Sequence, residues 1–285
     1  MTAGTDLRQR GAARGWASLV WRCAPLWWSC WGLMLAVGVT WPLAAAPGAM
    51  PLNPNFPFHA LIIRHFSQGG SLTWWPLMPF PEGQPIAALG GVTTLLSSLL
   101  NWIIPTVEAA NLGLLFSLAL SAYCVMWLAS SWGWRAGAQA ATAAAALLAP
   151  QVCGEVINGR IENVAPGAFA LVLLSLQMRG WRMPATALAG MVWAAFSSPY
   201  LAVPAGLLLT LGTLTRSWRT RATGLAVALL TAAMVFLYFL PITALENTGI
   251  TSGPISIGSR PLPLVELAVP LIPPTDRAGL QGSLN

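Results

Sequence analysis

Charged residues are scarce in this chain of 285 residues, where Asp, Glu, Lys and Arg together make up 8% and Lys is absent. A soluble globular protein has about a quarter of its residues charged, because its surface faces water. Hydrophobic residues make up 56% of the chain, and the mean hydropathy is +0.66. This composition excludes a soluble globule and a disordered chain, and it is typical of a protein that crosses a membrane several times.

Cysteine and histidine are also few, with 4 Cys and 2 His. The Cys form no CxxC or Cys/His pattern, and His59 and His65 fall on different faces of a helix, so we expect no metal site built on them. No Walker A, GxGxxG or GxSxG motif is present. We therefore expect no cofactor, although a divalent ion held by carboxylates is left open. Because the Arg residues are scattered between apolar runs, nucleic acid is not an expected partner.

Apolar segments long enough for membrane spans recur along the chain. A spanning helix needs roughly 20 apolar residues. The first segment is about 23 residues long and ends at a possible cleavage site (Ala44-Ala45-Ala46), but a signal peptide has an apolar core of only about 7–15 residues, so we expect an uncleaved anchor. The expected spans, about seven, are residues 24–46, 109–130, 137–153, 163–178, 184–197, 200–214 and 223–243.

The positive-inside rule sets the orientation. With residues 1–23 in the cytoplasm, every later Arg group between spans falls inside if residues 92–105 do not cross. That segment is too short to cross comfortably and is predicted to be a surface or re-entrant helix. Residues 184–214 are predicted to form a helical hairpin that turns at residues 197–200. The Arg groups are Arg135, then Arg179 and Arg182, then Arg216, Arg219 and Arg221.

The expected fold is all-α: a polytopic transmembrane helical bundle forming a single domain over residues 1–285. A long external loop, residues 47–108, carries short surface helices, and residues 244–285 form an external C-terminal segment. That segment ends without a closing span, which fits either a short form or a piece of a longer protein. The expected location is the inner (plasma) membrane of the cell, with the N-terminus in the cytoplasm and lipid as a partner.

Two polar clusters fall on the external side. The first lies in the loop and contains Asn55, His59, Arg64, His65 and Glu82. Arg64 and His65 beside the bilayer suit a lipid phosphate, or they solvate the loop at the headgroup level. Pro81-Glu82-Gly83 has the composition of a turn.

The second cluster joins two spans and contains Glu155, Asn158, Arg160, Glu162 and Asn163. Carboxylates and Arg are costly this close to lipid unless they pair or line a cavity. Two interpretations stay open, a Glu–Arg loop pair and a polar binding site.

The order of these features resembles the bacterial multi-spanning glycosyltransferases of the GT-C type, in particular the branch of YfhO-like membrane proteins. The resemblance rests on the Arg-rich start, Asn55-x-x-x-His59, Phe80-Pro81-Glu82-Gly83, Ala110-Asn111-Leu112 and the Asn158–Asn163 stretch. It implies a helical bundle whose first external loop faces a cavity. There a sugar would move from a polyprenyl-phosphate carrier to an acceptor.

One departure from that family concerns the acid of the first external loop. Asn53 and Asn55 stand there, and an amide cannot accept a proton near neutral pH. Glu162, Glu155 or Glu82 must then serve as the base, or the chain is a non-catalytic scaffold or lipid-sugar binding protein. The expected substrate ligands are Asn55, His59, Arg64, His65, Asn158 and Arg160. A transporter is the weakest alternative, because the cores of the expected spans hold no ionisable residue.

Overall fold

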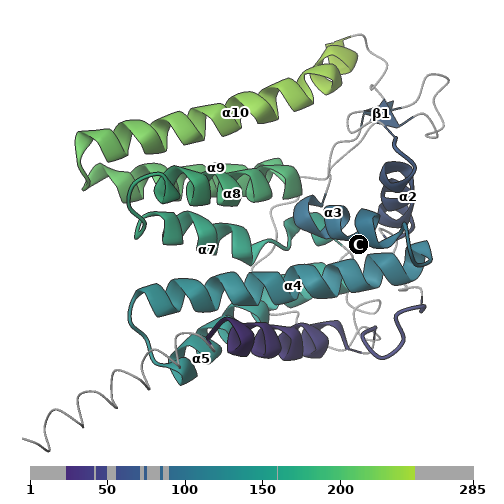
Figure 1. Cartoon of the computed structure of the whole chain (residues 1–285). Coiled ribbons are helices and arrows are strands. Elements are labelled where there is room, and N and C mark those ends of the chain that lie inside the picture. Colours follow the sequence, from purple (N-terminus) through teal and green to yellow (C-terminus); the bar gives the residue numbers. More distant parts are fainter. Residues whose placement is uncertain are drawn as a thin grey trace, which may run out of the picture.

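The computed structural model of the chain, drawn in Figure 1, describes residues 24–41, 43–49, 56–70, 74–75, 84–85, 90–158 and 160–247. These residues are almost entirely helical. One short antiparallel pairing joins β1 (Trp74–Trp75) to β2 (Gln84–Pro85). The expected cytoplasmic segment 1–23 and most of the C-terminal segment 244–285 lie outside the described residues.

The helices follow the apolar segments of the sequence, with several changes at their ends. The first runs over Ala24–Thr40 and stops before Pro42. The others are α2 (Phe56–Ser67), α3 (Gly91–Leu100), α4 (Thr106–Ser131), α5 (Ala136–Leu147), α6 (Pro150–Ile157), the 3-10 turn η1 (Ile161–Asn163), α7 (Pro166–Ser175), α8 (Arg182–Ser197), α9 (Pro199–Leu214) and α10 (Trp218–Asn247).

Prolines set three of the helix breaks. Pro150, Pro166 and Pro199 each stand at the first position of a helix, where the missing N–H is tolerated, and the residue before a proline avoids helical geometry. The expected single span 137–153 is therefore divided into α5 and α6, which meet at an angle of 47°. The break before Pro199 falls within the four residues where the sequence places the turn of a helical hairpin.

Within the residues that the structure describes, two helices are long and apolar enough to cross a membrane, or three if the bent pair α5–α6 is one span. At 1.5 Å per residue, the 26 residues of α4 measure about 39 Å, more than the ~30 Å hydrocarbon core. Shorter apolar helices lie at Ala24–Thr40, Gly91–Leu100, Pro166–Ser175 and Tyr200–Leu214. The described helices thus have the composition of a membrane protein, and two or three of them have full spanning length where the sequence predicts about seven spans.

The long helices lie roughly alongside one another (Figure 1). Packing runs from α4 through α7, α8 and α9 to α10, which lies at the edge. On the other side of α4, Trp28 of the first helix donates a hydrogen bond from Nε1 to Oε1 of Gln139 in α5, at 2.8 Å. The ring of Trp28 also meets Tyr123 of α4 edge-on. A buried indole N–H therefore joins the first helix to α5.

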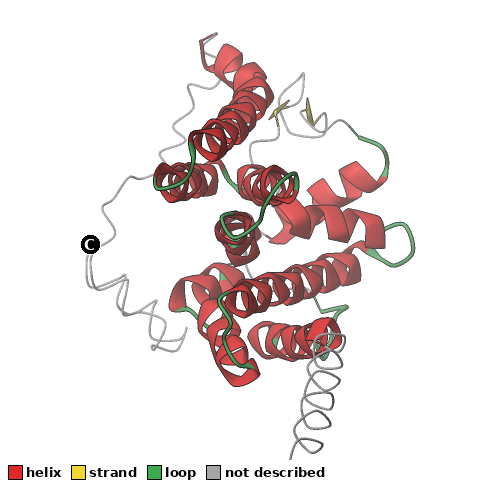
Figure 2. Ribbon diagram, turned by 60° about the vertical axis from the view of Figure 1, so that its left-hand side comes forward, coloured by secondary structure: helices red, strands yellow, loops and turns green. Residues whose placement is uncertain are grey.

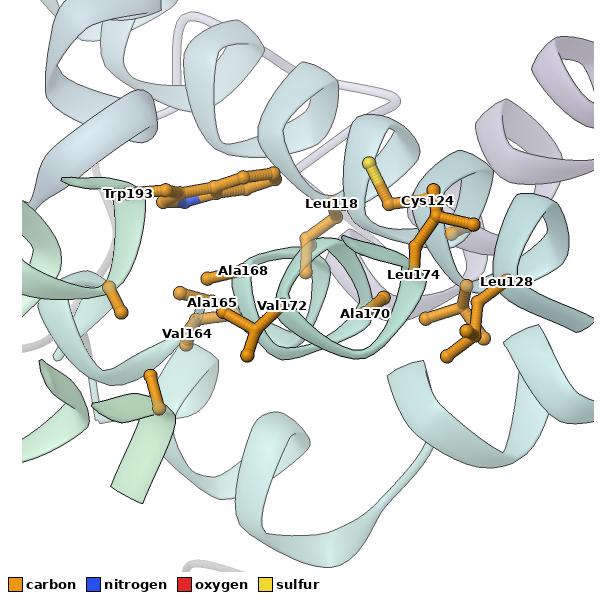
Figure 3. Packing of buried hydrophobic residues seen from close by; sticks show 14 of the residues in the cluster. Leu118, Cys124, Leu128, Val164, Ala165, Ala168, Ala170, Val172, Leu174 and Trp193 are labelled. Atoms are coloured by element: carbon orange, nitrogen blue, oxygen red, sulfur yellow. The ribbon is translucent and has the colours of Figure 1, made fainter. Parts of the chain in front are cut away.

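The apolar core is concentrated where α4, α7 and α8 meet. Figure 3 shows buried Leu118, Ala168, Val172 and Trp193 gathered around α7. The helices approach closely because small residues face one another: a Cβ added to Gly167 would lie 2.8 Å from the Cα of Ser121. Such contacts between small residues are typical of helices packed within a membrane.

Basic residues gather at one end of the bundle. The connections α4–α5, α7–α8 and α9–α10 all lie at the left-hand end in Figure 1, and Figure 2 brings their loops forward. The Arg groups that follow α4, α7 and α9 in the sequence are in or beside these connections. At the opposite end, α2 packs on α3 and α4, and η1 packs on α3 and α8. The three Arg groups that the positive-inside rule assigns to one side of the membrane therefore lie at the same end of the bundle.

Candidate functional site

Helix α3, which the sequence places at the membrane surface or re-entering it, has an inverted distribution of polarity. Its buried face consists of Thr93, Thr94, Ser97 and Ser98. Its exposed face carries Leu95 and Leu99, which are 59% and 46% exposed. In water this arrangement would be unfavourable, whereas in lipid the apolar face is the one that belongs outside. The polarity of α3 therefore favours a helix immersed in the bilayer, the re-entrant alternative.

The hydroxyls of α3 face α4. Thr93 donates from Oγ1 to Oγ of Ser117 at 2.8 Å, and Ser97 packs directly on Gly113. Within the described residues, the hydroxyls of Thr94, Ser97 and Ser98 have no hydrogen-bond partner. A buried hydroxyl left without a partner costs about 1–3 kcal/mol. The face of α3 that packs inside the bundle is therefore rich in hydroxyl groups.

Two glycines bring the start of α3 into contact with the second polar cluster. Gly90 and Gly91 have φ of +66° and +53°, which a residue with a Cβ adopts with strain. A Cβ on Gly91 would lie 3.0 Å from the backbone N of Ser197, and one on Gly90 would lie 3.6 Å from Cδ1 of Ile161 in η1. Gly90 and Gly91 therefore pack the start of α3 against both η1 and the end of α8.

The second cluster forms one compact turn between α6 and η1. Asn163 donates from Nδ2 to Oε2 of Glu155 at 3.3 Å, and Glu155 is half-buried. The backbone N–H of Arg160 donates to the carbonyl of Glu155 at 2.9 Å, while the Arg160 side chain is exposed. Asn158 ends α6 as its exposed C-cap. Asn163 is thus a hydrogen-bond donor to Glu155, and the Arg160 guanidinium faces outward.

The residues of the first cluster that lie on α2 point in different directions. His59 is buried, at 4% exposed, whereas Arg64 one and a half turns later is exposed. His65 is half-buried, and its ring packs directly on Gly70 and is 5.6 Å from the ring of Phe66. His59 and His65 therefore occupy different surroundings, as their spacing of six predicts.

The side chains of three expected site residues lie outside the part of the chain that the structure describes. Asn55 and Glu82 lie outside the described residues, and of Glu162 only the backbone, in η1, is described. The remaining ones form two groups: Glu155, Asn158 and Arg160 lie in the last turn of α6 and directly after it, and His59, Arg64 and His65 lie on α2. Helix α3 contacts both α2 and η1, so both groups border the same short helix.

Two polar residues near this end were not among the expected site residues. Asn111 is 6% exposed and donates from Nδ2 to the carbonyls of Pro47 and Ala49, at 2.6 and 2.9 Å. Glu108 lies against Gly48, where an added Cβ would be 3.1 Å from Oε1. Asn111 interrupts an apolar run of the sequence. A single Asn in such a run predicts a side chain that is hydrogen-bonded within the protein, but it does not indicate which residues accept the bonds. Together they hold the segment after the first helix against the start of α4.

Metal ligands do not converge in the part of the chain that the structure describes: no group of three or more His, Cys, Asp or Glu is found there. The residues present instead offer two exposed guanidinium groups, Arg64 and Arg160, and two half-buried carboxylates, Glu155 and Glu108, of which Glu108 packs on Gly48. This set suits recognition of an anion and transfer of one proton.

Comparison with known proteins identifies no relative: no family model, no curated protein and no solved structure matches the chain.

Proposed function

We propose that this chain is a polytopic membrane protein, with about seven crossings, that binds a polyprenyl-phosphate-linked sugar at its extracytoplasmic end and transfers the sugar to an acceptor. The proposal takes its reaction from the resemblance to GT-C glycosyltransferases. The observation that carries it is the composition of the end opposite the basic connections, where Glu155 and Arg160 are joined by a backbone hydrogen bond and Arg64 lies on α2, and where α3 contacts both α2 and η1.

The polarity of this end supports binding at the membrane surface. A lipid-linked sugar places its phosphate at headgroup level and its acyl chain in the bilayer. The apolar face of α3, with Leu95 and Leu99, suits the chain, and Arg64 and Arg160 suit the phosphate, because a planar guanidinium donates two hydrogen bonds at once and stays charged.

The transfer itself requires one base and one stabilised leaving group. The acceptor hydroxyl oxygen attacks C1 of the sugar and forms the new glycosidic bond, and its proton passes to a carboxylate. The bond between C1 and the phosphate oxygen breaks, and its electron pair stays on the phosphate. Of the two carboxylates in the second cluster, Glu155 is the one with described surroundings, and Glu162, seven residues later in η1, is the alternative. Arg160 and Arg64 would stabilise the charge that builds on the phosphate.

Two observations favour a second candidate, a non-catalytic lipid-sugar binding protein. One carboxylate oxygen of Glu155 already accepts a hydrogen bond from Asn163, so it is engaged within the protein rather than free to receive the acceptor's proton. The chain also lacks an acid between Asp6 and Glu82, where the resemblance places one. Binding without transfer would need only the arginines and the apolar surface.

The two candidates are separated by measuring binding and transfer together. We expect Arg160→Ala to abolish binding of a short-chain polyprenyl-phosphate sugar to the purified chain, with Gln177→Ala, an exposed polar residue after α7, as the control. We expect Glu155→Gln to retain binding, because the amide oxygen still accepts from Asn163, and to lower the transfer rate by about 10²–10⁴-fold.

The outcomes are distinct. Undiminished binding in the Arg160 variant removes this residue from the site. Binding without transfer in the unmodified chain establishes the non-catalytic candidate. If the unmodified chain neither binds nor transfers any lipid-linked donor, the proposed function is wrong.

The topology is tested by labelling single cysteines in a cysteine-free variant, because Cys30 is exposed in the native chain. Asn158 and Trp218 are both exposed and belong to opposite ends. With the N-terminus inside, a membrane-impermeant reagent added to intact cells labels Asn158→Cys and spares Trp218→Cys. The reverse pattern overturns the orientation.

A further inference from the structure

The basic end of the bundle carries a concentrated positive charge. We define the basic surface as the six arginines of the α4–α5, α7–α8 and α9–α10 connections and the adjoining first turns. All six are exposed, and no acid occurs in these connections or in the first turns of α5, α8 and α10. The residues are Arg135, Arg179, Arg182, Arg216, Arg219 and Arg221.

The position of these arginines on their helices is unfavourable for the isolated protein. Helices α5, α8 and α10 all begin at this end, and the start of a helix carries a partial positive charge. Arg135 is the N-cap of α5, Arg182 is the first residue of α8, and Arg219 is the second residue of α10. A cation is disfavoured at each of these positions, and the neighbouring arginines repel one another. An anion bound from outside the chain would relieve both effects.

Tryptophans set the depth of the basic surface in the membrane. Trp181 and Trp218 are 76% and 73% exposed, and the rings of Trp132 and Trp134 lie 5.3 Å apart at the end of α4. Exposed Trp is enriched at headgroup level, where the ring meets lipid and its N–H meets water. Arg219 lies over the Trp218 ring, with Cζ 5.9 Å from the ring centroid. The guanidinium groups therefore lie beside rings suited to the headgroup region.

We propose that the basic surface binds the headgroups of anionic phospholipids, and that this binding stabilises the helix starts at this end. The proposal does not depend on the function suggested for the opposite end. The partner is a lipid rather than a nucleic acid or an acidic protein, because exposed Trp rings alternate with the arginines where apolar helices end. The phosphate of an anionic headgroup supplies the charge that the first turns of these helices lack.

The test uses the full chain purified in a neutral detergent and titrated with phosphatidylglycerol, phosphatidylcholine or inorganic phosphate, with thermal unfolding as the readout. We expect phosphatidylglycerol to raise the unfolding temperature, and the other two to leave it unchanged. Equal stabilisation by phosphatidylcholine, or by inorganic phosphate, would overturn the proposal, since the first shows no charge selectivity and the second no lipid.

A triple variant locates the effect. In Arg182→Gln/Arg216→Gln/Arg219→Gln, the concentration of phosphatidylglycerol at half-maximal stabilisation should rise about 100-fold, since each basic residue contributes about fivefold. Arg221 is left intact because its Nε donates to the carbonyl of Arg216 at 2.9 Å. The matched control replaces the same three residues by Lys, which keeps the charge and should keep the stabilisation. An unchanged midpoint in the Gln variant contradicts the proposal. If that variant does not fold, the comparison of the three titrants on the unmodified chain still decides it.

Discussion

Helices α4 and α10 are both long and apolar enough to span a membrane, yet they have opposite surroundings. The mean hydropathy of the most apolar 18-residue stretch is 2.0 in α4 and 1.7 in α10, but 67% of that stretch is buried inside the protein in α4 and only 17% in α10. Hydropathy therefore identifies both as spans and does not distinguish the centre of the bundle from its edge. In a membrane, lipid is as apolar as a neighbouring leucine, so burial against protein has to be specified by other features.

Small residues supply that specification in α4. Gly113, Ser117 and Ser121 recur every four residues and meet Ser97, Thr93 and Gly167 of the neighbouring helices. Close backbone approach makes each contact dependent on the absence of a larger side chain. Helix α10 buries Val227 and Thr231 while its larger residues point outward, including Leu225, Leu229 and Phe236. The two helices should accordingly respond differently to substitutions of the same kind.

The largest expected effect comes from placing a charge on the exposed face of α10. Leu229 is 60% exposed near the middle of the apolar window, so Leu229→Arg would put a guanidinium into lipid at a cost of about 3 kcal/mol in insertion. We expect a marked loss of the fraction that resists alkaline extraction from membranes. Thr215→Arg, in the α9–α10 connection, should leave that fraction unchanged. Equal behaviour of the two variants would mean that α10 does not face lipid.

A smaller effect is expected from enlarging a contact in α4. A Cβ on Gly113 would lie 2.8 Å from the backbone N of Ser97, so Gly113→Val must displace α3. Overpacking of this kind costs about 1–3 kcal/mol, or several degrees in the unfolding temperature in detergent. Ala226→Val on the exposed face of α10 is the matched control and should change the temperature little. Equal losses in both variants would refute the contrast between centre and edge.

The hydrogen bonds that join α4 to the segment after the first helix should stabilise the protein by about as much as Gly113→Val destabilises it. Asn111→Leu removes two donated hydrogen bonds and leaves the carbonyls of Pro47 and Ala49 to find other partners, at a cost of about 1–3 kcal/mol. We expect faster amide hydrogen exchange over residues 43–49 together with a lower unfolding temperature. Unchanged exchange there would show that these residues are held by other contacts.

The sequence predicts the helical class and the places of most apolar helices, because the apolar runs are long and prolines mark their breaks. It overestimates the length of several spans. Residues 163–178 contain only the ten residues of α7, since Pro166 delays the helix and it ends at Ser175. The bend at Pro150 was equally visible in the sequence, where a proline within a span signals an interruption.

The arrangement of the candidate site was much less accessible to sequence reasoning. Spacing predicts that His59 and His65 lie apart, because it needs only helical periodicity. The contact of Gly90 with Ile161, and that of Asn111 with Pro47 and Ala49, join residues more than sixty positions apart. The hydroxyl face of α3 does have a local signal, since Thr93, Thr94, Ser97 and Ser98 recur at helical spacing. Which residues share a surface depends on tertiary packing that no local pattern contains.

The smallest expected effect comes from a buried polar group on α10. Thr231 is 1% exposed, like the most buried residues of α4, and its hydroxyl donates to the carbonyl of Val227 one turn earlier at 2.9 Å. That carbonyl also accepts the helical N–H bond of residue 231. Thr231→Val keeps the shape of the side chain and leaves no group without a partner, so the stability in detergent should change by less than about 0.5 kcal/mol. A loss of stability as large as that of Asn111→Leu would mean that the Thr231 hydroxyl holds α10 to its neighbours. The difference in burial between α4 and α10 would then not be enough to explain how differently the two helices respond to substitution.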